Sequence, residues 1–418
     1  MTSYWIKTAP MPSFEAIHGQ HSCDVVIIGG GMTGVLLGYF LKQAGKHSIL
    51  LEADRIGMGH TGHSTGKISA LHHLAEYVSL PFEKARAFFS DQLESVEKYA
   101  ELVKMLQIDC GFKRITHIYQ DKKVRLDQLA NRFPEFEIDF ADHQIALANQ
   151  AQFHPLQFLA ALAPELEIYE QSRVLSVHGH TVRTQGAEVQ ARWIVFACQF
   201  PFLRFSGLYA LKMHQENSYL ASLDDSPSLE TMYNGEVTMR EVNDRLLFGG
   251  LASMTGDPLD KEAFDKLKQA HFPKSGILQR WANNDAMTLD HLPYIGKYSL
   301  FHPHWLVATG FEKWGMASAM LAASLLQEKI VHGAMRHRSL YAPGRLNRMS
   351  IKNAFGNMSR NLNAYLSHPE APICSHLGCP LVFNPLTQTY DCPCHGSRFD
   401  RNGQLINGPA QKPIETKK

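Results

Sequence analysis

Four cysteines and two histidines crowd into one short segment near the C-terminus, ICSHLGCPLVFNPLTQTYDCPCHGSRF. Cys374 and His376 form a C-x-H pair, and Cys392 and His395 form a C-x-x-H pair. Thiolates and imidazoles are metal ligands, and local crowding of both favours a metal centre over a disulfide framework. Each pair offers one sulfur and one nitrogen.

This pattern suits a [2Fe–2S] cluster in which one iron takes two thiolates and the other takes two imidazoles. The segment resembles Rieske proteins closely, including the pair Gly378-Cys379 and the run C-P-C-H-G-S. The resemblance implies four cluster ligands, Cys374, His376, Cys392 and His395. It also implies a disulfide between Cys379 and Cys394. A Cys₂His₂ zinc site is the alternative, but its usual spacing keeps like ligands adjacent.

The region before the first cluster loop is short for a Rieske domain, which usually carries several β-strands there. A predicted helix runs to about residue 365, and only residues 366–373 separate it from Cys374. We therefore expect a shortened supporting base. Either the rest of the chain supplies the missing support, or the cluster is labile.

A second chemical motif lies near the N-terminus, in DVVIIGGGMTGVLLGYFLKQAG. Residues 24–28 predict a buried parallel strand, residues 32–44 a helix, and residues 47–51 a second strand. Gly29, Gly31 and Gly34 form G-x-G-x-x-G between the first strand and the helix. They allow a tight turn, close approach of a pyrophosphate and close helix–strand packing. Glu52, which ends the second strand, is placed to accept a hydrogen bond from a ribose hydroxyl.

These residues resemble the FAD-dependent D-amino acid oxidase/glycine oxidase superfamily. Three more segments support the resemblance: residues 57–69 (GMGHTGHSTGKIS), 193–200 (WIVFACQF) and 289–319, which includes LDHLPYIG and LVATGFEKWGMASA. The resemblance covers roughly residues 20–335. No second G-x-G-x-x-G follows a strand, which argues against NAD(P)H as the electron donor. The residues expected to contact FAD are Gly29, Gly31, Met32, Thr33, Gly34, Glu52, Ala53, His60, Thr61, His63, Ser64, Val174, Ala197, Gly310, Phe311, Gly315 and Met316.

The implied fold is an α/β, Rossmann-like FAD-binding domain of the glutathione reductase type, with an interleaved α+β substrate domain and a small β-rich Rieske segment. The flavoenzyme part is expected over 20–340, with FAD-binding parts at about 20–75, 150–205 and 285–335. The substrate part then covers about 76–149 and 206–284. Residues 341–366 are interpreted as a linker and helix, and 367–418 as a shortened Rieske domain. Periodicity predicts helices at 81–106, 261–271 and 316–329, and a hairpin that turns at 243–244.

Four residues are candidates for catalysis or substrate binding. Arg240, on the predicted hairpin, could hold a substrate carboxylate, although a solvated charge on a strand is the more common outcome. Lys67 and Lys313 lie near the flavin segments. His63 falls near the place where some family members attach FAD covalently, although a histidine there more often hydrogen-bonds the cofactor.

The formal net charge of +1 does not indicate a nucleic-acid partner. The N-terminus has no signal-peptide pattern, and the most apolar stretch is interrupted by Glu312 and Lys313, so we expect a cytoplasmic protein without a membrane span. The expected activity is oxidation of a small amine or amino acid by hydride transfer to FAD. The Rieske cluster then passes electrons to an external acceptor, which could be a ferredoxin-like protein, a quinone or oxygen. An electron-transfer or redox-sensing module and an NAD(P)H-fed reductase are the alternatives.

Overall fold

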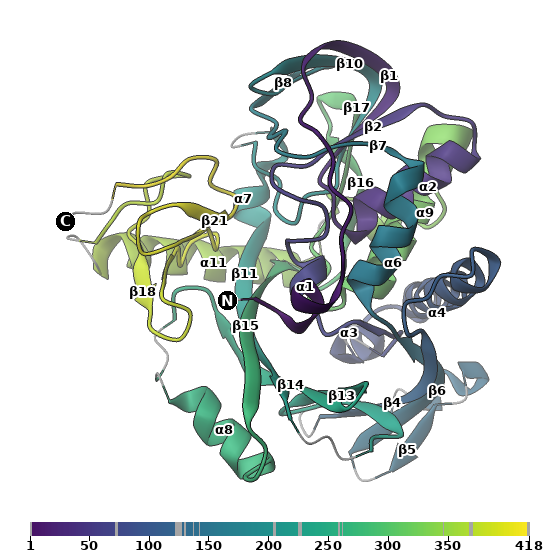
Figure 1. Ribbon diagram of the computed structural model, residues 1–418, viewed down its shortest axis with the longest axis vertical. Helices are drawn as coiled ribbons and strands as arrows, with labels where there is room; N and C mark the ends of the chain where they lie inside the picture. The colour runs from purple at the N-terminus through teal and green to yellow at the C-terminus, as the bar shows by residue number, and fades with distance from the viewer. Residues whose placement is uncertain are drawn as a thin grey trace.

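A computed structural model describes residues 2–71, 74–121, 128, 131–136, 138–141, 143–203, 206–224, 228–257, 260, 262–345, 347–367 and 371–415. Two large sheets and one small sheet organise this part of the chain (Figure 1). The small sheet, drawn in yellow, belongs to the C-terminal segment and lies to one side of both large sheets.

The first sheet has eight strands in the order β16-β17-β10-β1-β2-β7, with β9 paired to β10 and β8 paired to β9. Strands β1, β2, β7, β10 and β17 run parallel. The last four residues of β1 are completely or almost completely buried, as the continuous apolar run predicted. The bounds are β1 Gly19–Ile28, β2 Ser48–Leu51, β7 Glu167–Tyr169, β8 Ser176–His178, β9 Thr181–Arg183, β10 Ala187–Phe196, β16 Tyr294–Ser299 and β17 His302–Thr309.

Helices cover this sheet. Helix α2 (Met32–Gln43) follows β1 directly and packs against α9 (Gly315–His332), which in turn packs against α4 (Phe82–Met105). Together with the strand faces beneath them they form the largest apolar core. The predicted helices at 81–106 and 316–329 are thus confirmed. The smaller helices are α1 Tyr4–Thr8, α3 Leu74–Ser79, α6 Pro155–Leu162 and α7 Tyr209–Lys212, with 3₁₀ turns η1 Thr61–His63, η2 Pro134–Phe136, η3 Ala163–Glu165 and η4 Ser206–Leu208.

The second sheet has nine strands in the order β15-β11-β14-β13-β12-β4-β6-β3, with β5 paired to β6. The predicted hairpin is confirmed, because β13 and β14 are antiparallel and turn at Asn243-Asp244. Helix α8 (Ala263–His271) follows this hairpin, as predicted. The bounds are β3 Lys67–Ile68, β4 Lys113–Gln120, β5 Asp139–Ala141, β6 Gln144–Gln152, β11 Met213–Leu223, β12 Thr231–Asn234, β13 Thr238–Val242, β14 Arg245–Met254 and β15 Ile277–Thr288.

The C-terminal sheet has four antiparallel strands, β18 Val382–Asn384, β19 Thr389–Asp391, β20 Arg398–Phe399 and β21 Leu405–Asn407. All four follow the first cluster loop. The residues that immediately precede that loop form helix α11 (Arg348–Ser367) instead of strands. This arrangement matches the expected helix to about residue 365 and the shortened base.

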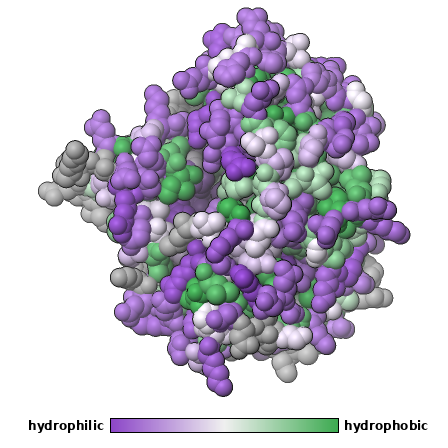
Figure 2. All heavy atoms as spheres, in the orientation of Figure 1, coloured by the Kyte–Doolittle hydropathy of each residue, from purple (hydrophilic) through white to green (hydrophobic). Residues whose placement is uncertain are grey.

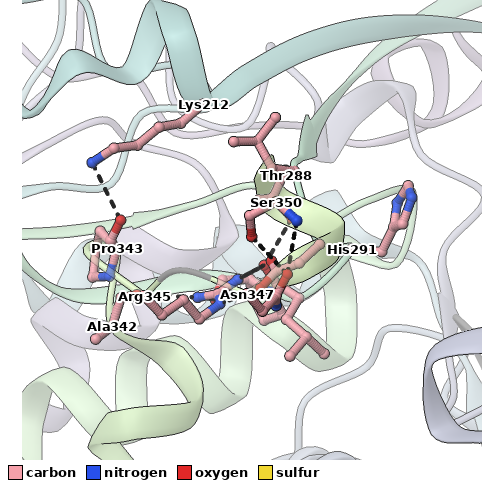
Figure 3. Close-up of polar contacts among 12 residues, drawn as sticks. Lys212, Thr288, His291, Ala342, Pro343, Arg345, Asn347 and Ser350 are labelled. Carbon is pink, nitrogen blue, oxygen red and sulfur yellow. Dashed lines mark hydrogen bonds and ion pairs between the residues drawn. The ribbon is translucent and has the colours of Figure 1, made fainter. Parts of the chain in front are cut away.

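The segment between the flavoenzyme part and α11 is tied down by polar contacts (Figure 3). It includes the short helix α10 (Arg338–Tyr341). The Arg345 guanidinium donates two hydrogen bonds, of 2.7 and 2.6 Å, to the two carboxylate oxygens of Asp290, and both side chains are buried. Asn347 donates a third to Asp290 and accepts from the backbone N–H of Ser350 at the start of α11. The linker is therefore a fixed connection, and α11 starts at a defined place.

Candidate flavin and cluster sites

A cavity of about 580 Å³ opens at the carboxyl ends of β1 and β2, where an open parallel sheet binds its ligand. Fifteen of the seventeen residues predicted to contact FAD line it. They are Gly29, Gly31, Met32, Thr33, Glu52, Ala53, His60, Thr61, Ser64, Val174, Ala197, Gly310, Phe311, Gly315 and Met316. The remaining two, Gly34 and His63, are not among the residues that line it.

The glycine turn is built for close approach of backbone to ligand. Gly29 has φ +116°, and a Cβ there would lie 2.8 Å from the Ala197 carbonyl oxygen. A Cβ on Gly34 would lie 2.0 Å from the Gly29 carbonyl oxygen, so Gly34 serves helix–strand packing. Helix α2 begins after Gly31, which has no side chain to cap the helix, and the Met32 N–H donates to the Thr61 hydroxyl at 3.0 Å. The N-terminus of the helix, with the positive end of its dipole, fits a pyrophosphate.

Glu52 holds the turn as well as lining the cavity. One carboxylate oxygen accepts from the backbone N–H of Gly30 at 2.7 Å, and the other accepts from the N–H of Asp54 at 2.9 Å. Burial raises the pKa of the Glu52 carboxyl, which these two donors partly offset. Each oxygen keeps a further lone pair for a ribose hydroxyl.

The N-terminal helix α1 and its N-cap residue hydrogen-bond to the second glycine-rich segment, residues 57–69. The sequence pattern did not indicate this role. The Trp5 indole N–H donates to the Ser64 carbonyl at 2.7 Å, and the Ser3 hydroxyl donates to the Gly62 carbonyl. Ser3 and Trp5, which lie before the predicted start of the flavoenzyme domain at residue 20, therefore help to shape its cofactor loop.

Two of the catalytic candidates are placed where they do not face the cavity. Arg240 is 2% exposed, and its Nη1 donates to the carbonyls of Thr65, Gly66 and Phe153. Arg240 thus connects the flavin loop to the second sheet. This differs from the expected substrate clamp, because the guanidinium is buried against backbone carbonyls and does not line the cavity. His63 turns its Nδ1 to the Gly59 carbonyl at 2.8 Å and is not among the residues that line the cavity.

The two lysine candidates do line the cavity. The Lys67 ammonium is buried and donates to the Tyr233 carbonyl, the Asn234 side-chain oxygen and the Thr238 hydroxyl at 2.5–2.7 Å. Burial, and secondarily Arg240, lowers its pKa well below the usual value. Lys313 pairs with Glu216 at 2.6 Å.

Sequence reasoning missed Asp285, a buried carboxyl that lines the same cavity. It accepts from the Ser218 hydroxyl at 2.9 Å and from the Asn283 amide at 3.0 Å. Burial raises its pKa to about 6, despite the attraction of Lys313. A carboxyl that titrates near neutral pH in a cofactor cavity can exchange a proton with a substrate. The polar run Asn283–Asp285 inside a strand was the available signal.

The four predicted cluster ligands lie together and are buried. Cys374 and Cys392 are 2% and 1% exposed, and the rings of His376 and His395 are perpendicular with centroids 5.1 Å apart. Backbone N–H groups of His376 and Leu377 point at the Cys374 sulfur, and a hydrogen bond from Cys392 lowers the Cys374 pKa to about 7.

The histidine side of the site also fits a metal cluster. The His395 Nδ1 is buried without a hydrogen-bond partner, and burial lowers the pKa of this imidazole to about 4. A neutral ring with an orphaned nitrogen is the form that binds iron. Cys379 and Cys394 are joined as a disulfide, and their sulfurs lie within 4.8 Å of the Cys392 sulfur. These two cysteines are therefore not available as ligands.

The cluster domain rests on β11 and β15 of the flavoenzyme part. Gln215, which is buried, donates to the carbonyl of the ligand His395 at 2.7 Å and to the Gly408 carbonyl at 3.0 Å. Asn284 donates to the Gly396 carbonyl at 3.1 Å, and Asn217 donates to Asp391. The flavoenzyme sheet supplies the support that the shortened base lacks.

The cofactor cavity itself reaches the cluster domain. Four residues of its C-terminal part belong to the cavity lining: Asn407, Gly408, Ala410 and Gln411. Gln215 hydrogen-bonds both this segment and the His395 carbonyl, so one side chain joins the cavity lining to a cluster ligand. The two redox sites share a boundary.

Comparison with known proteins agrees with both sites. Residues 24–329 match the FAD dependent oxidoreductase family (DAO), and residues 370–418 match the Rieske [2Fe-2S] domain. The chain belongs to the DAO family of FAD dependent oxidoreductases and carries a C-terminal Rieske domain. It is an oxidoreductase of the amino acid oxidase type that binds FAD and a [2Fe–2S] cluster.

The chain is 28% identical to YhfW of Bacillus subtilis, whose name describes it as a Rieske 2Fe-2S iron–sulfur protein, over 99% of this chain and 97% of that one. It is 22% identical to the gamma-glutamylputrescine oxidoreductase of Escherichia coli, over 80% of this chain and 90% of that one. The crystal structure of glycine oxidase from Geobacillus kaustophilus superposes with a TM-score of 0.65 at 18% identity, over 78% of this chain and all of that one. In the described part of the chain, none of the helices has the length and apolar character needed to cross a membrane.

Proposed function

We propose that this protein oxidises a small amine or amino acid and delivers the electrons to an external acceptor by way of its Rieske domain. The observation that carries the proposal is the shared boundary of the two sites, since Asn407, Gly408, Ala410 and Gln411 line the flavin cavity and follow the cluster loops. When bound, FAD accepts a hydride from carbon and the cluster accepts single electrons at a potential above that of plant-type ferredoxins.

The overall reaction balances as follows. The substrate loses a hydride from carbon and a proton from nitrogen, so its C–N bond becomes C=N, and water can hydrolyse the imine. Two electrons leave the protein for two one-electron acceptors. Asp285 lies in the cavity and has a pKa near 6, so it is suited to take the proton.

The cavity charges favour the amine end of the substrate. The cations in the lining are Lys67, Lys313 and Arg173. Both lysines are occupied by partners, whereas Asp285 and Glu236 present carboxylates there. Tyr119 and Trp314 also line the cavity, with ring centroids 6.4 Å apart, and aromatic faces attract a cationic nitrogen. We infer that a cationic amine group is the recognised element.

The test is an anaerobic screen of the purified protein against amino acids, N-methyl amines and diamines, with flavin absorbance and cluster EPR recorded separately. The proposal predicts that at least one amine bleaches the flavin and that the cluster signal follows. Bleaching by NADH in place of any amine would establish a reductase. A flavin that no amine reduces would indicate an electron-transfer module without substrate oxidation.

A further inference from the structure

Helix α11 carries an apolar stripe along its outer face. Ile351, Phe355, Met358, Leu362 and Tyr365 follow one another at spacings of four, three, four and three residues, which places them on one side of a helix. Each is between 44% and 68% exposed. Such a regular seam is typical of a helix face that packs against a partner.

The opposite face of α11, which contacts the rest of the protein, is more polar than the exposed one. Asn353 donates to the Leu289 carbonyl at 2.8 Å, and Asn357 and Arg360 are half-buried. Figure 2 shows a face of the molecule where hydrophilic residues predominate and hydrophobic ones form separate patches. A helix that turns polar residues inward and five apolar residues outward reverses the usual arrangement, which marks an interaction site.

The stripe leads to the cluster. The Tyr365 hydroxyl donates to the Leu377 carbonyl at 2.5 Å, and Ala364 packs against the apolar core around the cluster cysteines. Leu377 follows the ligand His376 and is itself exposed, as is Ile373 before the ligand Cys374. Figure 1 shows α11 beside the yellow C-terminal sheet. The surface is therefore continuous from the helix to the first cluster loop.

The exposed side of helix α11 carries a positive charge. The sequence of α11 contains no aspartate or glutamate, and Arg360 lies half-buried on its opposite face. Lys352 is exposed beside Ile351 at the start of the stripe. A complementary partner would carry acidic groups around an apolar centre.

We propose that the α11 stripe, together with Ile373 and Leu377, docks an acidic one-electron carrier protein that accepts electrons from the cluster. The proposal rests on the proposed function for the direction of electron flow. A second copy of this chain is disfavoured, because two such helices would bring basic residues together and no acidic ones. A lipid surface could bind the apolar residues of the stripe and its positive charge, but it would not accept an electron.

The experiment uses the full chain reduced with dithionite, so it does not depend on substrate oxidation. An acidic blue-copper protein and a basic cytochrome c serve as probes, and stopped-flow absorbance measures the second-order rate of cluster reoxidation. We expect the acidic probe to react faster, with a rate that falls as salt is added. Equal rates, or a faster basic probe, would overturn the proposal.

Two variant pairs locate the contact. Phe355→Ser should lower the rate of cluster reoxidation by the acidic probe at least about tenfold, since a few central residues carry most of the binding energy of an interface. Lys352→Glu should lower the same rate severalfold, since charges set the rate of encounter. The matched controls are Phe301→Ser and Lys104→Glu, which change exposed residues on other elements. The cluster EPR spectrum should be the same in all four. Controls that slow the probe as much as the stripe variants would refute the assignment.

Two further measurements exclude the other occupants. Sedimentation should give a species whose mass does not change with Phe355→Ser, and vesicles of phosphatidylcholine with phosphatidylserine should not retain the protein. A dimer that dissociates in Phe355→Ser would assign the stripe to a second copy. Vesicle binding that this variant abolishes would assign it to a membrane surface. Failure of amine oxidation with intact docking would refute only the proposed function.

Discussion

Gln215 offers a direct test of how the cluster domain is held. Its side chain donates to the His395 carbonyl at 2.7 Å and to the Gly408 carbonyl at 3.0 Å, and it is buried between the two parts. Gln215→Leu keeps the volume similar and removes both donors. Because each of the two stranded buried carbonyls costs roughly 1–3 kcal/mol, we expect docking to weaken by about 2–6 kcal/mol in total.

This weakening should appear in hydrogen exchange. A loss of about 2–6 kcal/mol corresponds to a roughly 30- to 20,000-fold larger population of the undocked form. Some backbone amides exchange only when the cluster domain undocks. In peptides 392–399 and 405–411, the protection of such amides should fall by up to this fold-change, while the amides of β1 and β2 should keep their protection. The control is Gln269→Leu on the exposed face of α8. Wild-type protection in Gln215→Leu would refute the reasoning.

Three further changes test other parts of the structure. Gly34→Ala should empty the FAD site, seen as lost flavin absorbance per chain, because the added Cβ would lie 2.0 Å from a carbonyl oxygen, whereas Gly344→Ala meets nothing within 4 Å and should retain flavin. Arg345→Met should lower the free energy of unfolding by about 3–5 kcal/mol, measured with urea, since it leaves the buried Asp290 carboxylate without its ion-pair partner. Asp285 has a folded pKa of about 6, raised by burial, so its stabilising contribution is present at low pH and is lost as pH rises from about 4 to 6. Asp285→Asn should therefore gain stability relative to wild type over that range, and a constant difference between the two would contradict the shift.

Local patterns accounted for much of the fold and most of the cofactor contacts. The glycine turn and the cluster loops are recognisable because their residues are close in sequence and each spacing has a steric or coordination reason. The long helices and the β13–β14 hairpin follow from apolar periodicity, and the structure places them within a few residues of the expected bounds.

Side-chain direction could not be predicted in the same way. Arg240 and His63 were chosen by type and position. The partners of Arg240 come from distant segments, and His63 turns to the Gly59 carbonyl within its own loop, so only the structure shows that these partners are backbone carbonyls. The docking residues Gln215 and Asn217 were missed for a similar reason. Their polar run HQENS inside a strand was the visible signal, and its meaning depended on a domain about 180 residues away in sequence.

The most direct test of the central claim is an anaerobic titration with an amine substrate found in the screen, followed to full reduction. The substrate supplies two electrons, whereas flavin and cluster together take three, so complete reduction should require about 1.5 equivalents per chain. The account predicts that the cluster EPR signal rises together with flavin bleaching. Complete flavin bleaching at about one equivalent, with the cluster still oxidised, would contradict it.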